Sequence, residues 1–391
     1  MQIECDVLVV GAGPAGSSAA RSAALNGAKT IFIDKKREIG DPVKCAEGIG
    51  KYLFPYLPFK IPRDQLIWRI DGMFFWADDI SIEREGSPWD GYSVDRKRFD
   101  KWLAENAVDA GAKLFTNTEL VDLILDEENN VKKAIAKREN HFLEIIPKVV
   151  VAADGSESTV LKLLDLYHPK EGDLGEVKSY EMRNLDLKYP HYEQFYFGDF
   201  APRAYAYIFP LSKSVANVGV GTTLSKKSLE EYFDSFIHSE PVKNQLRKGK
   251  IKNEKSGKAT IRHLTDKWVY GNTIFVGDAA NQNIKPFIEG ILPAIICGDS
   301  VGEIASLSIQ EKILLTDEIY KNKINNKIGK LFGISNKSTN LVYDLPQNIE
   351  NKAAHLIYLG VFSNIITDDN LKLVESNYDP VHIKNLILQL R

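Results

Sequence analysis

The sequence predicts an α/β protein in which a discontinuous nucleotide-binding core is interrupted by an antiparallel β-sheet domain and followed by a helical C-terminal region. Three observations support this fold class. A strand, a glycine-rich turn and a helix open the chain, and two later buried strands each end in a paired glycine and aspartate. Between residues 180 and 221, aromatic residues alternate with small and polar ones, a period-two pattern typical of an antiparallel sheet with one packed face.

The first element is the most readable. Residues 5–10 form a β-branched run of strand length that ends at Gly11-x-Gly13-x-x-Gly16, and an alanine-rich helix and a second strand follow. In such a Rossmann-like unit, Gly11 permits a tight turn, Gly13 lets the backbone approach a pyrophosphate, and Gly16 lets the helix pack closely on the strand. The N–H groups at the helix N-terminus can then bind phosphate.

Asp34 closes the second strand of this unit. The spacing suits a carboxylate that accepts hydrogen bonds from ribose hydroxyls. Because a carboxylate would repel a 2′-phosphate, the expected cofactor is an adenine dinucleotide without that group, either NAD or FAD.

Two later pairs favour FAD. Asp154-Gly155 and Gly277-Asp278 each follow a buried strand. The aspartate of the second pair, Asp278, can bind the ribityl hydroxyls of a flavin. A helix N-terminus near Gly290 can stabilise negative charge on the reduced ring.

The remaining elements support a discontinuous division of the chain. A helix is expected within 95–111, strands over 113–116, 120–125, 149–153 and 272–276, and a hairpin over 131–137 and 141–146. We therefore predict an FAD-binding domain over residues 1–65, 95–165 and 260–305, a β-rich substrate domain over 66–94 and 166–259, and a helical region over 306–391.

Composition excludes several classes of protein. The chain has 391 residues, of which 44% are hydrophobic and 26% charged, which excludes disorder, collagen and a coiled-coil rod. A formal net charge of −3 gives no reason to expect nucleic acid as a partner. The three cysteines, Cys5, Cys45 and Cys297, cannot form a disulfide framework, so a reducing compartment is expected.

Neither a targeting signal nor a membrane span is expected. The apolar run over 3–10 has no basic region before it and no cleavage site. The most apolar stretch, 287–309, carries Glu289, Asp299 and Glu303, and three charges are too costly for a lipid-exposed helix.

The ordered motifs resemble those of a known group of flavoproteins. With YSVDR over 92–96 leading into a helix, they are similar to the FAD-binding core of the group that contains p-hydroxybenzoate hydroxylase. Two further motifs resemble the geranylgeranyl reductases within that group. They are VKCAEG over 43–48, and PRAYAYIFP over 202–210 followed by GVG over 219–221. The resemblance spans about residues 3–305.

The resemblance implies a FAD-dependent reductase that hydrogenates geranylgeranyl double bonds in archaeal-type membrane lipid precursors, with a hydride from N5 of the reduced flavin. It implies Cys45 as the catalytic residue, either as proton donor or as a group that adjusts access to the flavin. The implied substrate-binding residues are Tyr205, Tyr207, Phe209, Pro210, Gly219 and Gly221. The implied cofactor-binding residues are Gly11, Gly13, Ala15, Gly16, Asp34, Lys35, Cys45, Ala46, Arg96, Asp154, Gly155, Gly277, Asp278, Pro286, Gly290 and Ile291.

The implied partners follow from a prenylated lipid substrate. Such a substrate must be taken from a membrane, so we expect a cytoplasmic protein in peripheral contact with the inner face of the cell membrane. The electron donor is NAD(P)H, a ferredoxin or a reduced deazaflavin, and the sequence does not choose among them. No metal site is expected, because the histidines lack metal-ligand spacing.

Other functions stay open at this stage. They are an FAD-dependent monooxygenase of the p-hydroxybenzoate hydroxylase type, a prenyl reductase that acts on a quinone side chain, and a non-catalytic flavin-binding electron carrier. The last is motivated by residues 281–291, where Asn281-Gln282-Asn283 and the bulky 287–289 depart from the family's glycine-rich turn.

Overall fold

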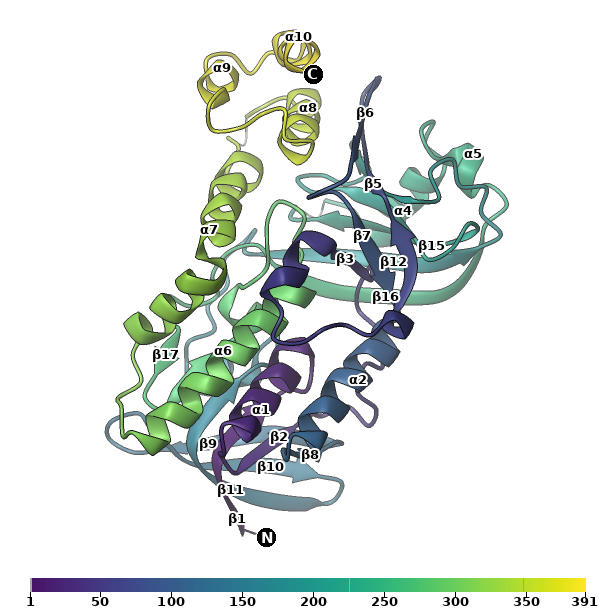
Figure 1. Ribbon diagram of the computed structural model, residues 1–391. Coiled ribbons are helices and arrows are strands. Elements are labelled where there is room, and N and C mark those ends of the chain that lie inside the picture. The colour runs from purple at the N-terminus through teal and green to yellow at the C-terminus, as the bar shows by residue number, and fades with distance from the viewer. Residues whose placement is uncertain (1, 225, 347) are drawn as a thin grey trace.

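The structure is a computed structural model that describes residues 2–224, 226–346 and 348–391. Within these ranges the chain forms a nucleotide-binding core, a large β-sheet, a small sheet between them and a set of C-terminal helices (Figure 1). This arrangement confirms the predicted fold class.

A mainly parallel sheet forms the core. β1 (Gln2–Val10) lies at its centre, between parallel neighbours β2 (Thr30–Ile33) and β11 (His141–Ala152). Residues 7–10 are buried, which explains their continuous run of apolar side chains. α1 (Pro14–Leu25) connects β1 to β2. The sheet extends through β8 (Lys113–Phe115) on one side, and through β18 (Thr273–Phe275) and β17 (Val269–Tyr270) on the other.

β11 differs from the predicted pair of separate strands over 141–146 and 149–153. It is one strand of twelve residues that continues through Pro147. Its first part pairs with β10 (Val131–Arg138), its last part pairs with β18, and β1 runs alongside from Glu144 to Ala152. Pro147 lies between the stretches paired to β10 and to β18, so neither ladder is interrupted by the missing N–H. β9 (Thr118–Leu125) completes this antiparallel extension.

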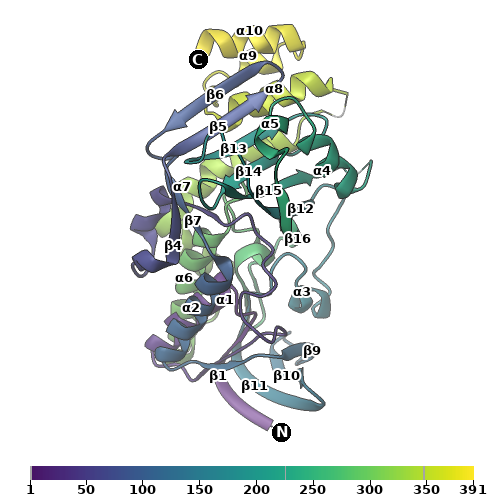
Figure 2. The ribbon, with the colours of Figure 1, turned by 90° about the vertical axis from the view of Figure 1, so that its right-hand side faces the viewer.

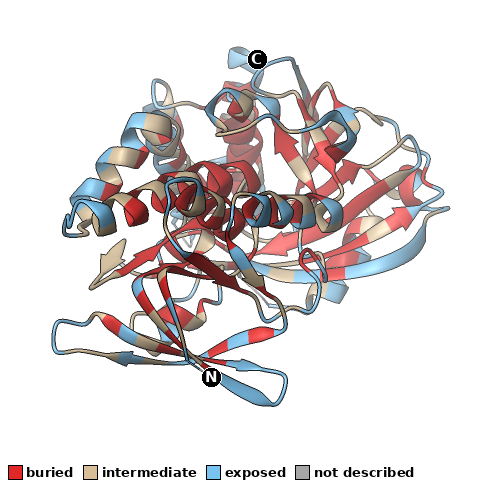
Figure 3. Ribbon diagram, turned by 60° about the horizontal axis from the view of Figure 1, so that its bottom comes forward, coloured by how far each residue is buried: buried red, intermediate tan, exposed pale blue. Residues whose placement is uncertain are grey.

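Three helices pack along the core sheet: α1, α2 (Arg96–Asp109) and α6 (Ile291–Gln310) (Figure 1). The helices α1 and α6 approach closely because small residues face each other. A Cβ atom at Gly298 would lie 2.3 Å from the carbonyl oxygen of Ala15, and one at Gly302 would lie 2.2 Å from that of Ala19. Figure 3 shows the buried residues gathered in the central helices and the strands beneath them.

α6 is also, among the described residues, the one helix long and apolar enough to cross a membrane. Its most apolar window is 78% buried inside the molecule. Asp299 and Glu303 on this helix pair with Lys327 and Lys323 of the next helix. The burial is that of a helix in the core of the fold, in agreement with the sequence analysis.

The large sheet carries the aromatic alternation seen in the sequence. Its strands are antiparallel neighbours except for β13 and β5, which run parallel. On one face Phe75, Phe195, Phe197, Tyr207 and Phe209 form a single apolar cluster. The strands, in spatial order, are β16 (Lys250–Thr260), β12 (Leu174–Arg183), β15 (Val215–Thr222), β14 (Ala206–Pro210), β13 (Tyr192–Phe197), β5 (Gly72–Ala77) and β6 (Ile80–Glu85).

A small sheet and short helices connect these two parts. β7 (Gly91–Val94) pairs with β3 (Gly48–Gly50) and β4 (Leu66–Ile70). The small sheet therefore joins β3, from a segment assigned to the FAD-binding domain, to strands assigned to the substrate domain, and the domain boundaries stay a prediction. The shorter elements are η1 (Lys51–Tyr56), η2 (Arg63–Gln65), α3 (Thr159–Leu163), α4 (Leu229–Ile237), α5 (Lys243–Leu246) and η3 (Gly277–Ala280).

The C-terminal helices cover the aromatic face of the large sheet. α7 (Asp317–Tyr343), which is kinked at Ile328, runs from the core toward the sheet, and α8 (Asn351–Phe362) packs against β5 and β13 (Figures 1 and 2). α9 (Leu371–Glu375) and α10 (Pro380–Leu390) complete this layer. Arg203 anchors the segment after α7 by donating to the carbonyl oxygens of Leu345 and Pro346, each at 3.0 Å.

Candidate active site

One cavity of about 860 Å³ joins the core to the large sheet. At one end it is lined by residues that follow the carboxyl ends of β1, β2, β11 and β18, which is where open parallel sheets bind nucleotides. At the other end it is lined by the aromatic face of the large sheet and by α7 and α8. The structure therefore brings the two predicted sets of site residues to one continuous space.

The glycine-rich loop has the geometry that its sequence predicts. Gly11 has a φ of +100°, and a Cβ there would lie 2.4 Å from the carbonyl oxygen of Ala153. A Cβ at Gly16 would lie 1.8 Å from the carbonyl oxygen of Gly11, so Gly16 serves packing and does not line the cavity. At Gly13 the space of a side chain is open, and no side chain caps the N-terminus of α1. A phosphate can therefore reach the free N–H groups.

Asp34 is fixed by the backbone of this loop. Its Oδ2 accepts a hydrogen bond from the Ala12 N–H at 2.8 Å, and its Oδ1 accepts one from the Lys36 N–H at 2.8 Å. Each carboxylate oxygen has a second lone pair, and Asp34 and Lys35 both line the cavity. This arrangement fits the predicted contact with ribose hydroxyls.

Asp154 follows the end of β11, and Asp278 follows the end of β18. The Oδ2 atom of Asp154 accepts from the Val160 N–H at 2.9 Å, whereas its Oδ1 atom is buried and has no hydrogen-bond partner among the described residues. Burial raises the pKa of Asp154. Asp278 accepts from the Asn283 amide at 3.2 Å and also lines the cavity with Gly155 and Gly277.

The N-terminus of α6 opens onto the same space. Its N-cap residue, Gly290, makes no side-chain cap, and Pro286, Gly290 and Ile291 line the cavity. An open glycine approach, an unsatisfied carboxylate oxygen and an uncapped helix N-terminus are the contacts that a pyrophosphate, a polyhydroxyl chain and an anionic ring require. The residues present therefore fit FAD.

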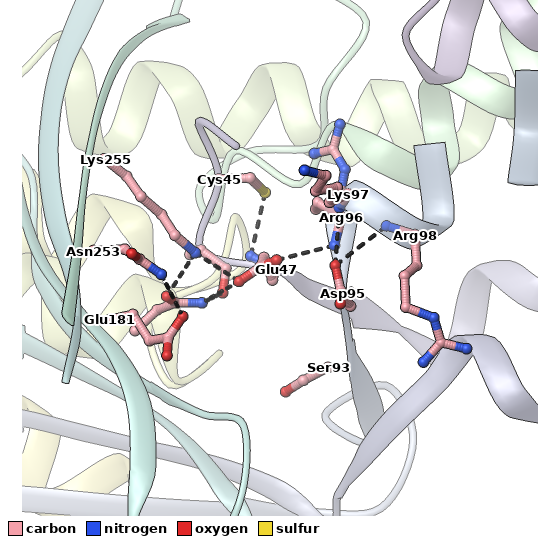
Figure 4. A network of polar contacts seen from close by, with 12 residues as sticks. Cys45, Glu47, Ser93, Asp95, Arg96, Lys97, Arg98, Glu181, Asn253 and Lys255 are labelled. Atoms are coloured by element: carbon pink, nitrogen blue, oxygen red, sulfur yellow. Dashed lines mark hydrogen bonds and ion pairs between the residues drawn. The ribbon is translucent and has the colours of Figure 1, made fainter. Parts of the chain in front are cut away.

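The segment that carries Cys45 is held by a buried polar network (Figure 4). The Cys45 sulfur accepts a hydrogen bond from the Glu47 N–H at 3.2 Å. The Glu47 carboxylate accepts from Lys255 Nζ at 2.6 Å, from the Asn217 amide at 2.8 Å and from the Arg96 N–H at 2.9 Å. Glu47 itself has a φ of +74°. These contacts present Cys45 and Ala46 to the cavity, which both of them line.

Arg96 also interacts with the Cys45 side chain. Its guanidinium donates two hydrogen bonds to the Asp100 carboxylate, each at 2.8 Å. Although burial acts to lower the pKa of Arg96, the Asp100 carboxylate and the Cys45 sulfur raise it overall. The thiol thus lies beside a permanent positive charge at the cavity wall.

The predicted aromatic wall is present and larger than expected. Tyr205, Tyr207 and Phe209 line the cavity together, and the Tyr205 hydroxyl donates to the carbonyl oxygen of Phe287 at 2.6 Å. Burial raises the pKa of both tyrosines. Phe287 and Phe362 join this wall with ring centroids 5.1 Å apart. Phe362 comes from α8, a region in which the sequence showed no motif.

Two of the predicted substrate-binding residues lie behind the wall. Gly219 does not line the cavity, and a Cβ there would lie 2.5 Å from Cζ of Tyr207. Gly219 therefore makes room for the tyrosine ring. Pro210 also lies outside the lining, and its carbonyl oxygen accepts from the Ser93 hydroxyl at 2.6 Å. Gly221 does line the cavity.

The atypical segment 281–291 makes several hydrogen bonds, both within itself and to neighbouring elements. Gln282 accepts from the Gly277 N–H at 2.9 Å and donates to the Tyr320 hydroxyl at 2.7 Å. Lys285 donates to the Asn281 side chain at 2.6 Å and is 4% exposed. Burial lowers the pKa of Lys285 to about 7, although Asp278 acts to raise it.

The sequence analysis missed a pair of buried acids. Glu289 accepts from the Gly50 N–H and from the Tyr52 hydroxyl, each at 2.8 Å. Glu193 lines the same cavity. The available signal for Glu193 was its position in β13, two residues before Phe195 and therefore on the aromatic face. Among the described residues no group of acidic, histidine or cysteine side chains is arranged to hold a metal ion.

Comparisons with known proteins match these two halves separately. A family model described as "FAD dependent oxidoreductase" matches residues 6–157. A second family model, described as "Geranylgeranyl reductase catalytic domain", matches residues 173–257. The first range covers the glycine loop and Asp154, and the second covers the part of the aromatic wall formed by Tyr205, Tyr207 and Phe209.

Whole-chain relatives carry related names. The chain is 36% identical to a digeranylgeranylglycerophospholipid reductase of Methanococcus aeolicus over 84% of each chain. It is 32% identical to digeranylgeranylglycerophospholipid reductase 1 of Methanosphaera stadtmanae over 95% of this chain and 93% of the relative. Among solved structures, a geranylgeranyl bacteriochlorophyll reductase-like protein from Thermoplasma acidophilum matches all of both chains with a TM-score of 0.81 and 28% identity. A halogenase solved with FAD matches with a TM-score of 0.68 and 12% identity, which shows the fold alone.

Proposed function

The chain belongs to the digeranylgeranylglycerophospholipid reductase family, and we propose on that basis that it uses FAD to hydrogenate the geranylgeranyl double bonds of archaeal-type membrane lipid precursors. Family membership confirms the resemblance recognised in the sequence. The single observation that supports the activity in this molecule is the continuous cavity, which joins a site that fits FAD to an apolar wall.

The residues that would hold FAD divide by the part of the cofactor they suit. The open backbone at Gly13 and the N-terminus of α1 suit the pyrophosphate, and Asp34 suits the adenosine ribose. The unsatisfied oxygen of Asp154 and the neighbouring Asp278 suit hydroxyl groups. Bound and reduced, FAD supplies a hydride.

The aromatic wall would bind the prenyl chain. Tyr205, Phe287 and Phe362 contact one another, and all three line the cavity. Burying an apolar chain against them is favourable at about 25 cal/mol for each Å² removed from water. The same wall excludes water from the alkene. Binding of the prenyl chain along it would also hold the reacting carbons near the flavin end of the cavity.

We assign Cys45 a place beside the reacting groups. Its sulfur lies at the cavity wall between the Glu47 N–H and the Arg96 guanidinium. Both neighbours are fixed by buried hydrogen bonds, which suits a residue that must hold one position against a cofactor. The resemblance leaves two roles for Cys45, proton donation and control of access to the flavin.

A direct assay tests the function. The purified holoenzyme is reduced anaerobically with dithionite and given a digeranylgeranylglycerophospholipid, and the lipid is then examined by mass spectrometry. We expect a gain of two mass units for each double bond. An intact, reduced holoenzyme that leaves the lipid mass unchanged would contradict the reductase, and oxygenation with NADPH or no turnover at all would support the monooxygenase or the electron carrier. A parallel sample with a prenylated quinone tests the closest alternative substrate.

We also propose that the cavity receives its lipid at a membrane surface. Ile334 of α7 lines the cavity and is 55% exposed, so the cavity has an apolar mouth beside this helix. Flotation with anionic lipid vesicles should recover the wild-type protein and less of an Ile334→Glu variant. Replacing dithionite in turn by NAD(P)H, a reduced ferredoxin or a reduced deazaflavin identifies the electron donor by the rate of flavin reduction.

A further inference from the structure

Glu193 is an acidic side chain on an otherwise apolar face. It begins the aromatic alternation of β13, so it shares a face with Phe195. The register of β13 and β14 places it opposite Phe209, which faces the same cavity. Glu193 is 8% exposed, and it lines the cavity itself.

The position of Glu193 is close to the segment that carries Cys45. A Cβ placed at Gly48 would lie 2.0 Å from Oε1 of Glu193. Gly48 is three residues from Cys45 in the sequence. The Glu193 carboxyl group therefore lies against the segment that carries Cys45. A larger residue at position 48 would require the Glu193 carboxyl group to shift.

The two buried acids of the cavity have different surroundings. The Glu289 carboxylate receives hydrogen bonds from the Gly50 N–H and the Tyr52 hydroxyl. Glu193 receives no hydrogen bond from any described residue, so nothing in that part of the chain stabilises its ionised form. When two neighbouring carboxyl groups differ in this way, the proton resides on the one without donors.

Among the described residues, the titratable groups that interact with Glu193 are themselves acids. They are Glu289 before α6, Tyr52 in η1 and Tyr205 before β14, with Cys45 next to Tyr205. Burial, together with the charge of Glu289, raises the pKa of Glu193 to about 8. Burial also raises the pKa of Glu289, but the Gly50 N–H and the Tyr52 hydroxyl act to lower it, and Glu193 has no such donors in the described part of the chain. At neutral pH the side chain is therefore mainly a carboxylic acid that has an O–H to donate.

We propose, on the basis of the reductase function above, that Glu193 is the acid that protonates the alkene. A hydride from the reduced flavin forms a C–H bond at one alkene carbon, and the π electron pair forms a second C–H bond at the neighbouring carbon with the proton of Glu193. The O–H bond of Glu193 breaks, the flavin is oxidised by two electrons, and the Glu193 carboxylate is reprotonated from solvent before the next double bond. Glu289 acts as a positioning residue, because its charge keeps the proton on Glu193. Cys45 then retains the second role named above, control of access to the flavin.

Infrared spectroscopy tests the protonation state without any turnover. The wild-type holoenzyme should show the carbonyl stretch of a protonated carboxylic acid at pH 7, and this band should disappear with a midpoint near pH 8. The band should lose intensity in Glu193→Gln and keep it in Glu83→Gln, which removes an exposed carboxyl group from β6. Equal band intensity in the wild type and Glu193→Gln, or no band in the wild type at pH 7, would overturn the proposal.

Single-turnover kinetics test the proton transfer. Wild-type alkene reduction should slow about tenfold for each pH unit above 8, because the acid form is then depleted. Glu193→Gln should bind FAD and accept electrons normally but reduce the alkene about a hundredfold or more slowly, and Glu193→Asp should recover part of the rate with the same kind of pH profile. Equal rates in Glu193→Gln and the wild type would overturn this role alone. No alkene reduction by the wild type would overturn the proposed function and this role with it.

Discussion

The residue that carries the buried Glu47 carboxylate also positions the Cys45 thiol, because its N–H donates to the Cys45 sulfur. Glu47 and Lys255 are each about nine-tenths buried or more, and their ion pair is completed by the Asn217 amide and the Arg96 N–H. Removing one member of a buried pair leaves the other as an uncompensated charge, which costs about 3–5 kcal/mol. The network therefore couples the position of Cys45 to the stability of the whole fold.

Lys255→Met should reveal this coupling. We expect a loss of about 3 kcal/mol in the free energy of unfolding, measured by chemical denaturation of the holoenzyme. As a control, Lys148→Met removes an exposed pair with Asp6 and should cost less than about 1 kcal/mol. Equal losses in the two variants would show that the Glu47 network is not a buried charge pair of this kind.

Substitutions of Cys45 separate a site role from a packing role. Cys45→Ser and Cys45→Ala should both retain the flavin spectrum, because neither the Glu47 network nor the cofactor contacts of the glycine loop depend on the thiol. Turnover with a geranylgeranyl lipid should fall in both by about tenfold or more, which corresponds to about 1.4 kcal/mol of transition-state stabilisation. Full activity in both variants would make Cys45 a packing residue.

Lys285 predicts a pH dependence of stability. The unfolded chain keeps the Lys285 proton up to its ordinary pKa of 10.5, whereas burial lowers the folded pKa to about 7. Between these values the unfolded state binds more protons, so this residue makes the fold more stable as pH rises, by up to about 1.4 kcal/mol per pH unit. Denaturation at pH 7, 8 and 9 should show this increase in the wild type relative to Lys285→Met, and parallel curves for the two proteins would refute it.

At the level of single residues, local motifs in the sequence predicted residues that line the cofactor end of the cavity, but they did not predict Glu193. Gly11, Gly13, Asp34 and Asp154 are recognisable because each follows a strand in a fixed local motif. Glu193 belongs to no local motif. Its meaning depends on burial and on the absence of donors, and both are set by segments distant in the sequence.

At the scale of elements, the turn between β1 and α1 shows how two glycines in one loop differ in their effect. Gly11 is confined by a positive φ and by the carbonyl oxygen of Ala153, whereas the space beside Gly13 is open. Gly11 is thus confined by the fold, whereas Gly13 leaves open space beside the loop.

Alanine substitutions test this distinction. Gly13→Ala should leave the thermal unfolding of the flavin-free protein unchanged and raise the Kd for FAD by about tenfold or more, as measured by fluorescence titration. Gly11→Ala should instead destabilise the fold itself, because the new methyl group meets backbone atoms. If Gly13→Ala bound FAD as tightly as the wild type, the open space would not be the pyrophosphate path.

The elements also mark the limit of prediction from local pattern. The core strands and α1 are readable because they are buried on defined faces and carry the matching periodicity. The single long β11 is not readable, since Pro147 suggests a break that only the neighbouring strands show to be harmless. The parallel pairing of β13 with β5 likewise joins segments more than a hundred residues apart.

At the scale of the whole molecule, the candidate active site is completed by C-terminal segments that carry no recognisable functional motif. α8 contributes Phe362 to the cavity, and Arg203, from the loop between β13 and β14, anchors the segment after α7. Figure 2 shows α8 beside the strands of the large sheet. The sequence predicts that this region is helical but not that it completes the wall, because no motif marks the packing of α8 on β5 and β13. The cavity is therefore a property of the assembled fold.

The most direct test of the central claim, that one cavity passes electrons from flavin to a prenyl double bond, is anaerobic reoxidation of the reduced holoenzyme by lipid. The flavin is titrated to full reduction with dithionite and no excess, and either a digeranylgeranyl lipid or its fully saturated counterpart is added. We predict that the absorbance of oxidised flavin returns with the unsaturated lipid, one flavin for each double bond reduced, and does not return with the saturated one. Reoxidation by both lipids, or by neither, would contradict the account.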